Sequence, residues 1–186
     1  TRISGMILLY EFGLLVCLDV ILVTIKHIFI ISDRRERIET LRKIAKAVNS
    51  DKTMIFINTK YDLEESLQKL QYHNYNVAAL AGNIDKQSKK KAVEDFQNGR
   101  LQYLLATDVA ARGLQIDHVS TVINVNLPEE PTEYLHRAGR CGRNNEQGLC
   151  ISIITENELN KIKKYQKAFN INIVQKRLYN GKIVSK

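Results

Sequence analysis

Three arginines and two glycines lie within eight residues, in the segment His136-Arg-Ala-Gly-Arg-Cys-Gly-Arg143. Arg140 and Arg143 are three residues apart, so in a helical turn they would share one face. Each guanidinium offers a planar fork of donors that fits phosphate oxygens, and Gly139 and Gly142 would leave the backbone open to a ligand or a neighbouring domain. The segment therefore predicts a polyphosphate site. The alternative is an exposed arginine turn that ion pairs hold in place.

A second segment, from Leu104 to Gly113, joins an apolar run to a turn of small residues. The apolar run predicts a buried strand that ends at Thr107 and Asp108, and the turn ends at Arg112. In open parallel sheets, ligands bind beyond the carboxyl ends of the strands. We therefore expect Thr107 and Asp108 to face a ligand. They could also cap the next helical turn, and the two roles are compatible.

Polar and basic residues follow two further apolar runs, as Asn58-Thr59-Lys60 and Gly82-Asn83. Hydroxyl, amide and backbone donors beside Lys60 would form a surface that follows the phosphates of a nucleic-acid strand. The run Lys89-Lys90-Lys91 could join this surface, although alone it is more typical of a solvated helix face. The formal net charge of +8 favours polyanions such as nucleic acid or acidic lipid headgroups, without naming one of them.

The elements that must position these residues indicate an α/β domain. From His27 onwards, short β-branched runs alternate with amphipathic stretches, which is the pattern of a parallel sheet with crossover helices. About six strands are expected, at His27–Ile31, Thr53–Ile57, Asn76–Leu80, Tyr103–Ala106, Thr121–Val125 and Leu149–Ile154. The expected helices are Arg34–Val48 with Asp33 as its cap, Tyr61–Tyr72, Asp85–Phe96, a short helix opened by Pro131, and Glu158–Phe169. Ile171–Val174 and a basic, solvated tail through Lys176, Arg177, Lys182 and Lys186 would follow.

The composition limits the class of protein. With 186 residues, 44% hydrophobic and 26% charged, the chain has the size and apolar content of one folded domain and is not a disordered chain. Cys17, Cys141 and Cys150 form no CxxC pair and lack clustered histidines, so neither a zinc site nor a disulfide framework is predicted. A reducing, intracellular setting fits best. The sequence begins at Thr1 without a secretory signal, so we expect a fragment rather than a secreted precursor.

The stretch from Met6 to Ile31 is unusually apolar, which raises the possibility of a membrane span. Glu11, Asp19 and Lys26 interrupt it, and a central Asp costs a few kcal/mol in a spanning helix. A buried strand or hydrophobic helix is therefore favoured over attachment to a membrane. We divide the chain into an apolar segment of uncertain role (1–26), the α/β domain (27–156), and a C-terminal helix with a basic tail (157–186).

Taken together, Ile55-Phe-Ile-Asn-Thr-Lys60, Ala106-Thr-Asp-Val-Ala-Ala-Arg-Gly113 and His136–Arg143 resemble motifs IV, V and VI of the DEAD-box RNA helicases, in the family's order. The resemblance covers residues 27–155. His136 is informative because the related DEAH-box and RecQ groups usually carry glutamine there. The resemblance implies the second, C-terminal RecA-like domain, a three-layer α/β/α fold with a mostly parallel sheet, and it implies RNA rather than DNA as the substrate.

In that family, two RecA-like domains close around ATP and RNA. The first domain supplies the P-loop lysine and the Asp-Glu-Ala-Asp sequence that holds Mg²⁺, and neither motif occurs in this sequence. The resemblance therefore implies one half of a cytoplasmic, monomeric, ATP-dependent RNA helicase that unwinds duplexes locally. Its ATP and Mg²⁺ would be held mainly by an N-terminal RecA-like domain, and this chain alone would be inactive. The alternative is a non-catalytic RNA-binding domain derived from a helicase.

The resemblance also assigns roles to single residues. Arg140 and Arg143 would be arginine fingers, which stabilise the charge that develops on the transferred γ-phosphoryl group. Contacts to the nucleotide would come from Gly113, Gln115, His136, Arg140 and Arg143. Contacts to the RNA backbone would come from Asn58, Thr59, Gly82, Lys89, Thr107 and Arg112, and coupling between the two sites from Asp108, His136 and Arg137.

Three positions depart from the family pattern. Gln115 stands where the family usually has an aspartate that reaches the ribose, Lys89 stands at a usual arginine, and Asn83 replaces a common aspartate. Gln115 can still hydrogen-bond a hydroxyl but lacks the carboxylate charge, so the affinity for nucleotide is expected to be weaker or altered. Lys89 keeps the positive charge and loses the bidentate fork.

Overall fold

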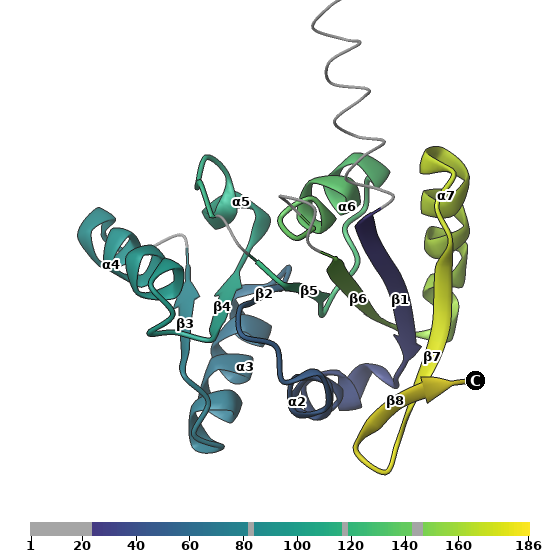
Figure 1. The fold of residues 1–186 in the computed structure, drawn as a ribbon, viewed down its shortest axis with the longest axis horizontal. Helices are drawn as coiled ribbons and strands as arrows, with labels where there is room; N and C mark the ends of the chain where they lie inside the picture. The colour runs from purple at the N-terminus through teal and green to yellow at the C-terminus, as the bar shows by residue number, and fades with distance from the viewer. Residues whose placement is uncertain (1–23, 82–83, 117–118, 143–146) are drawn as a thin grey trace, which may run out of the picture.

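The computed structural model describes residues 24–81, 84–116, 119–142 and 147–186 (Figure 1). Most of the apolar N-terminal segment lies outside these residues, as do Gly82, Asn83 and Arg143, so the expectations for them stay open. Within the described ranges, no helix has the length and apolar character needed to cross a bilayer.

The described residues form one sheet of eight strands in the order β3-β4-β2-β5-β6-β1-β7-β8. All neighbours pair in parallel except β7 and β8, which are antiparallel. The strands are β1 (Ile25–Ile31), β2 (Thr53–Phe56), β3 (Val77–Leu80), β4 (Tyr103–Ala106), β5 (Thr121–Asn124), β6 (Gly148–Ile154), β7 (Ile173–Tyr179) and β8 (Lys182–Ser185). The prediction of an α/β fold with a mostly parallel sheet is confirmed.

Helices cover both faces of this sheet (Figure 1). They are α2 (Arg37–Val48), α3 (Lys60–Tyr72), α4 (Lys86–Gln97), α5 (Asp108–Ala111), α6 (Pro131–Ala138) and α7 (Leu159–Phe169), with 3-10 turns η1 (Arg34–Glu36) and η2 (Glu156–Glu158). Side chains alternate along each strand, so Ile55 packs with α2 and α3 while Met54 and Phe56 pack with the helices of the other face. The result is the expected three-layer arrangement.

The sheet has two more strands than the approximate six expected, because the basic tail forms a hairpin. Ile171–Val174 was expected as a short element, but the strand runs from Ile173 to Tyr179 as β7 and returns as β8. Asn180 and Gly181 connect the two strands with φ of 46° and 72°. Asn-Gly is the preferred pair for a two-residue hairpin turn, which needs positive φ at both positions. The tail is therefore part of the sheet, in which Lys182 and Lys186 are exposed and Lys176 is half-buried.

Side chains cap the starts of α3 and α4, whereas the cap predicted at Asp33 is not formed. The Thr59 hydroxyl accepts a hydrogen bond from the Asp62 amide at 3.1 Å, and the Asp85 carboxylate accepts from two amides at the start of α4. Asp33 precedes η1, but its side chain makes no capping hydrogen bond, and α2 begins only at Arg37. The predicted cap at Asp33 is therefore wrong, because a 3-10 turn intervenes.

His27 is a buried titratable group in β1, with 3% of its surface exposed. Its Nδ1 lies 2.9 Å from the Tyr134 hydroxyl, while its Nε2 has no hydrogen-bond partner among the described residues. Burial lowers the pKa of His27 to about 4. The imidazole is therefore neutral in the folded protein at neutral pH.

We expect acid to destabilise the protein through His27. In the unfolded chain its pKa is about 6.5, so between pH 6.5 and 4 the unfolded chain binds the proton more readily. The contribution to the free energy of unfolding is complete above pH 6.5 and falls by about 2 kcal/mol at pH 5. Urea titrations at about pH 7 and pH 5 should show a smaller pH difference in His27→Gln than in wild type. The exposed His73→Gln is the control, and equal pH dependence in all three proteins would contradict the assignment.

Candidate functional site

The residues singled out after β4 and within and after α6 meet in one cavity of about 140 Å³. Phe56 at the end of β2 forms part of its lining, together with residues of the α5 turn and of α6. The lining contains Asp108, Ala111, Arg112, Gly113, Glu133, His136, Arg137 and Arg140. The cavity lies at the carboxyl ends of parallel strands, where ligands bind in such sheets.

Arg137 lies beneath this cavity and is almost completely buried, with 2% of its surface exposed. Its Nε and Nη2 donate to the two carboxylate oxygens of Asp108 at 2.7 and 2.5 Å. Its Nη1 donates to Asn124 Oδ1 at 3.2 Å and to the Asn126 carbonyl at 2.7 Å, and Nη2 also donates to Asn58 Oδ1 at 2.9 Å. These contacts use all five N–H groups of a guanidinium.

The complete hydrogen bonding of the Arg137 guanidinium limits the roles that this residue can have. A buried charge is tolerated when it is paired and fully hydrogen-bonded, and here the guanidinium also lies 5.1 Å from the centre of the Phe56 ring. No donor remains for a ligand, so Arg137 acts as a tie between the ends of β2, β4 and β5 and helix α6. The expected role of Asp108 and Arg137 in coupling the nucleotide and RNA sites stays a prediction.

Asn58 is drawn into the same network. Besides accepting from Arg137, its side-chain amide donates to the Leu127 carbonyl at 3.2 Å, and its backbone N–H donates to Asn126 Oδ1 at 3.1 Å. Both ends of the side chain thus bond within the protein. The expected contact of Asn58 with RNA would have to come from its backbone carbonyl or follow a rearrangement, because its backbone N–H is also bonded within the protein.

Arg140 lies in the turn after α6, because that helix ends at Ala138. The expectation that Arg140 and Arg143 share a helical face is therefore wrong for Arg140, and Arg143 lies outside the described residues. The Arg140 Nη1 donates to the Leu114 carbonyl at 2.7 Å, and Nη2 approaches the Ala111 carbonyl at 3.5 Å. Both arginines line the cavity, but Arg140 is half-buried whereas Arg137 is buried.

Gly142 is required by packing within the domain. Its φ is +73°, and a Cβ there would lie 2.6 Å from Ile25 Cγ1 and 3.2 Å from Thr24 Oγ1. The Thr24 hydroxyl donates to the Gly142 carbonyl at 3.0 Å. The open backbone predicted at this glycine is thus occupied by the start of β1, a neighbouring segment of the same domain.

The other predicted residues divide between the cavity and its surroundings. Exposed His136 lines the cavity, as does Arg112, whose Nη2 lies 3.3 Å from the carboxylate of Glu133. Thr107 caps α5, since its hydroxyl oxygen accepts from the Ala110 amide at 3.3 Å, and its own hydrogen is still available to a ligand. The capping alternative for Thr107 is therefore realised without excluding the other role.

Three further candidates lie away from the cavity lining. Gln115 is exposed, and its backbone carbonyl accepts from Gln97 Nε2 at 2.8 Å. Thr59 caps α3, and half-buried Lys89 is in the first half of α4. Within the same run, Lys90 pairs with Glu94 at 3.6 Å, as expected for a solvated helix face.

Sequence reasoning missed the two asparagines of the Arg137 network, Asn124 and Asn126. Asn124 is fully buried at the end of β5, where its amide nitrogen also donates to the Ser152 hydroxyl at 3.3 Å. A signal was present, because an asparagine inside an apolar strand must find a buried partner. The partner could not be known, since Arg137 comes from another element.

Residues 36–145, more than half of the chain, match the family described as the helicase conserved C-terminal domain. Related proteins include the DEAD-box ATP-dependent RNA helicase CshC of Bacillus cereus, 34% identical over 160 residues. This chain belongs to the DEAD-box RNA helicase family and corresponds to the C-terminal domain of such helicases.

The chain corresponds to only part of the length of its relatives. The match to CshC covers 86% of this chain and 41% of the relative. The match to the probable ATP-dependent RNA helicase YfmL of Bacillus subtilis, at 32% identity, covers 87% of this chain and 43% of the relative. The chain thus spans about two fifths of the length of these curated relatives.

Solved structures place this DEAD-box domain in the same fold. The C-terminal domain of the DEAD-box protein Dbp5 is similar with a TM-score of 0.78 and 29% identity, over 83% of this chain and 91% of that one. A DEAD-box protein from Methanococcus jannaschii is similar with a TM-score of 0.75 and 29% identity, over 84% and 42% of the two chains. Saccharomyces cerevisiae Dbp5 bound to RNA and ADP BeF3 gives 0.77 and 29%, over 83% and 42%.

Proposed function

We propose that this chain supplies the C-terminal half of an ATP-dependent RNA helicase, in which it contributes Arg140 and Arg143 to ATP hydrolysis and part of the RNA-backbone surface to local unwinding. The observation that carries the proposal is the cavity in which Arg112, His136 and Arg140 meet at the carboxyl edge of the sheet. Cationic forks at such an edge suit phosphate oxygens. A Dbp5 relative of similar fold was solved with RNA and ADP BeF3, which supports the same ligand classes here.

The side chains fit the phosphates of ATP better than they fit its metal ion. Of the two carboxylates in the cavity lining, Asp108 is bonded to Arg137 and Glu133 pairs with Arg112. Among the described residues, no group of His, Cys, Asp and Glu is placed to hold a metal. Mg²⁺ would therefore be held by an N-terminal RecA-like domain, and Arg140 would act across the gap between the two domains by stabilising charge on the γ-phosphoryl group.

The RNA contacts would be independent of sequence. The Thr107 hydroxyl, the start of α3 at Thr59, Lys89, Arg112 and Gly82 are suited to phosphate and sugar rather than to base edges. The Arg137 contacts join the ends of β2 and β4 to α6. A movement of the RNA-binding residues would therefore displace the residues that contact the nucleotide. We infer that ATP-driven domain closure is transmitted through this tie, with His136 at the open end of the cavity.

A second candidate function is an RNA-binding domain without catalysis. Gln115 favours it, because this residue is exposed, lies outside the cavity lining and lacks the carboxylate that the family uses toward the ribose. Such a domain would bind RNA with a steep salt dependence and would not respond to ATP.

One experiment separates these functions. The chain is joined to the N-terminal RecA-like domain of a relative such as CshC, and ATP hydrolysis is measured with and without RNA. We expect hydrolysis that RNA stimulates in the joined protein and none in this chain alone. RNA binding without stimulation would favour the non-catalytic domain, and the absence of both would reject both functions.

A further inference from the structure

A second groove lies between α2 and the β7–β8 hairpin, and it shares no residue with the cavity described above. Its volume is about 540 Å³. Ile30, Ile31 and Leu178 contribute apolar surface to its lining. The groove thus combines α2 with β7 and β8, and these two strands lie beyond the residues matched by the family.

The charges of this groove are all of one sign. Four cationic residues line it, Arg42, Lys43, Lys46 and Arg177, and its lining contains no carboxylate. A third groove, beside Asn58 and Thr59, shows the contrast, because its arginines and lysine face Asp62, Glu65, Glu129 and Glu158. Of the cavity and the two grooves described, only the groove at the hairpin is lined by cations without any carboxylate.

A carboxylate near this groove is already occupied. Glu39 accepts from Arg42 Nη2 at 2.6 Å and pairs with Lys69 Nζ at 2.9 Å. The hydrogen bond from Arg42 and the charge of Lys69 lower the pKa of Glu39 to about 2, so the carboxylate stays ionised and holds Arg42 in place. In the described part of the chain, no carboxylate forms an ion pair with Lys43, Lys46 or Arg177. Their charges remain available to a partner.

The hairpin adds an aromatic surface beside these charges. Tyr179 is 59% exposed, and the guanidinium of Arg177 lies 5.6 Å from the centre of its ring. Surfaces that hold single-stranded nucleic acid without sequence preference combine a cationic groove with exposed aromatic rings on which bases stack. An acidic peptide could also pair with the cations, but binding of such a peptide would not explain the exposed ring of Tyr179.

We propose that the groove between α2 and the β7–β8 hairpin is a second RNA-binding surface, which holds single-stranded RNA outside the contacts of the helicase core. Lys43, Lys46 and Arg177 would bind phosphates, and Tyr179 would stack on a base. The inference rests on the proposed function, because that function supplies RNA as the partner. It adds a contact that could keep the domain on its RNA after the core has released a strand.

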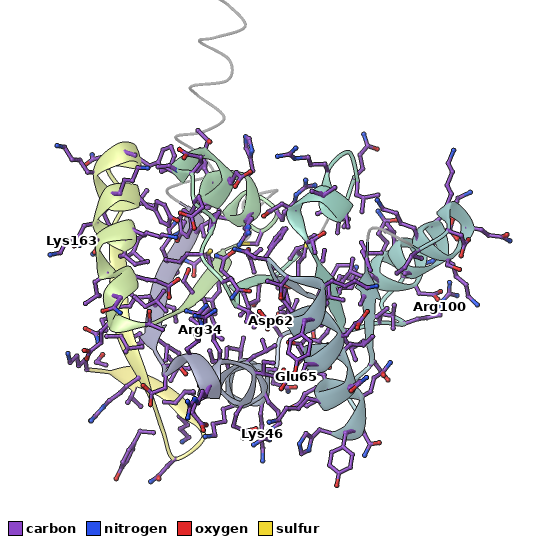
Figure 2. The ribbon with its side chains drawn as sticks, turned by 180° about the vertical axis from the view of Figure 1, so that it is seen from behind. Arg34, Lys46, Asp62, Glu65, Arg100 and Lys163 are labelled. Carbon is purple, nitrogen blue, oxygen red and sulfur yellow. The ribbon has the colours of Figure 1, made fainter. Side chains whose placement is uncertain are left out.

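The test compares two pairs of charge reversals in the full chain. Lys43→Glu with Lys46→Glu alters the groove, and Lys163→Glu with Lys167→Glu alters α7 on the other face of the sheet. Figure 2 labels Lys46 and Lys163, which lie on α2 and α7, well apart in the molecule. All four lysines are exposed, and both pairs change the net charge equally. Non-specific attraction should therefore fall alike in the two variants.

Binding of a labelled oligouridine of about 20 nucleotides is measured between about 50 and 200 mM KCl. We expect the groove variant to lose about tenfold in affinity and to have a shallower salt slope by about 1–2. The α7 variant should lose about twofold at most. Equal losses in the two variants would overturn the groove proposal alone, whereas a wild-type chain that binds no RNA would overturn the proposed function as well.

Photocrosslinking with 4-thiouridine supplies a second measurement that does not depend on altered charge. We expect crosslinked peptides from the hairpin around Tyr179 in addition to those around Thr59 and Thr107. Crosslinks confined to the latter two regions would overturn the proposal. So would protection of the groove by polyglutamate with unchanged RNA binding, since that result would assign the groove to an acidic protein partner.

Discussion

Replacing Arg140 with alanine is expected to lower RNA-stimulated ATP hydrolysis by about 10³-fold when the chain is joined to an N-terminal RecA-like domain. Arg140 lines the open cavity, and its guanidinium is held by the carbonyls of Leu114 and Ala111, so it is oriented before a phosphate arrives. Such prior orientation is what makes a cationic group effective toward a charge that develops only in the transition state. The loss should therefore appear in kcat at saturating ATP and RNA.

The controls separate loss of chemistry from loss of structure. Arg140→Lys keeps the charge but not the fork, so it should recover only a small part of the rate. Arg100→Ala removes an exposed partner of Asp95 away from the cavity and should leave kcat unchanged. Urea unfolding should show that Arg140→Ala remains folded. If that variant keeps the wild-type kcat, the assignment of Arg140 as an arginine finger fails.

Replacing Arg137 with alanine is expected to reduce the free energy of unfolding by about 3–5 kcal/mol. The change removes all five N–H donors of the guanidinium from a buried network and leaves the Asp108 carboxylate, itself 27% exposed, without its partner. The side-chain oxygens of Asn58 and Asn124 would lose the same donor. A half-buried charge without its partner, together with buried acceptors without their donor, costs more than an exposed pair. Equilibrium urea unfolding measures the loss.

Arg112→Ala is the matched control for Arg137→Ala. Arg112 also pairs with a carboxylate, that of Glu133, but its side chain is 73% exposed. Its loss should cost less than about 1 kcal/mol. Arg137→Lys should fall between the two, because an ammonium keeps the charge but cannot span five acceptor contacts. Similar costs for Arg137→Ala and Arg112→Ala would show that the network does not hold the domain together.

The two arginines illustrate how far a motif can be interpreted from its residue types. In the sequence, Arg137 and Arg140 are equivalent members of an arginine-rich run. In the structure, the last turn of α6 points Arg137 into the interior, while the chain leaves the helix before Arg140. Arg137 is therefore enclosed within the domain, whereas Arg140 lines the cavity, where we propose that it acts on a phosphate. Arg137→Ala should consequently show its main effect in urea unfolding, and Arg140→Ala should show it in ATP hydrolysis.

Much of the fold could be predicted because local sequence patterns indicate the positions of its strands and helices. The β-branched runs at β2, β4 and β5 have the length and flanking turns of buried parallel strands, and their positions agree within a residue or two with the structure. The hairpin at the C-terminus was missed, although Asn180-Gly181 is the turn signal for it. The charged residues Lys176, Arg177 and Lys182 obscured the strand pattern, because an edge hairpin has little apolar surface to bury.

Residue patterns along the chain were enough to predict the order of the strands, the DEAD-box family, and the arginines and polar strand ends that gather at one edge of the sheet. The three-dimensional packing was needed to find that Arg137 is enclosed by Asp108, Asn58 and Asn124, and that α2 and the hairpin form a cationic groove. Burial and pairing depend on neighbours from distant parts of the chain, which local patterns do not reveal. Residue type and local spacing fix what a side chain can do, and the packing of remote elements fixes which of those things it does.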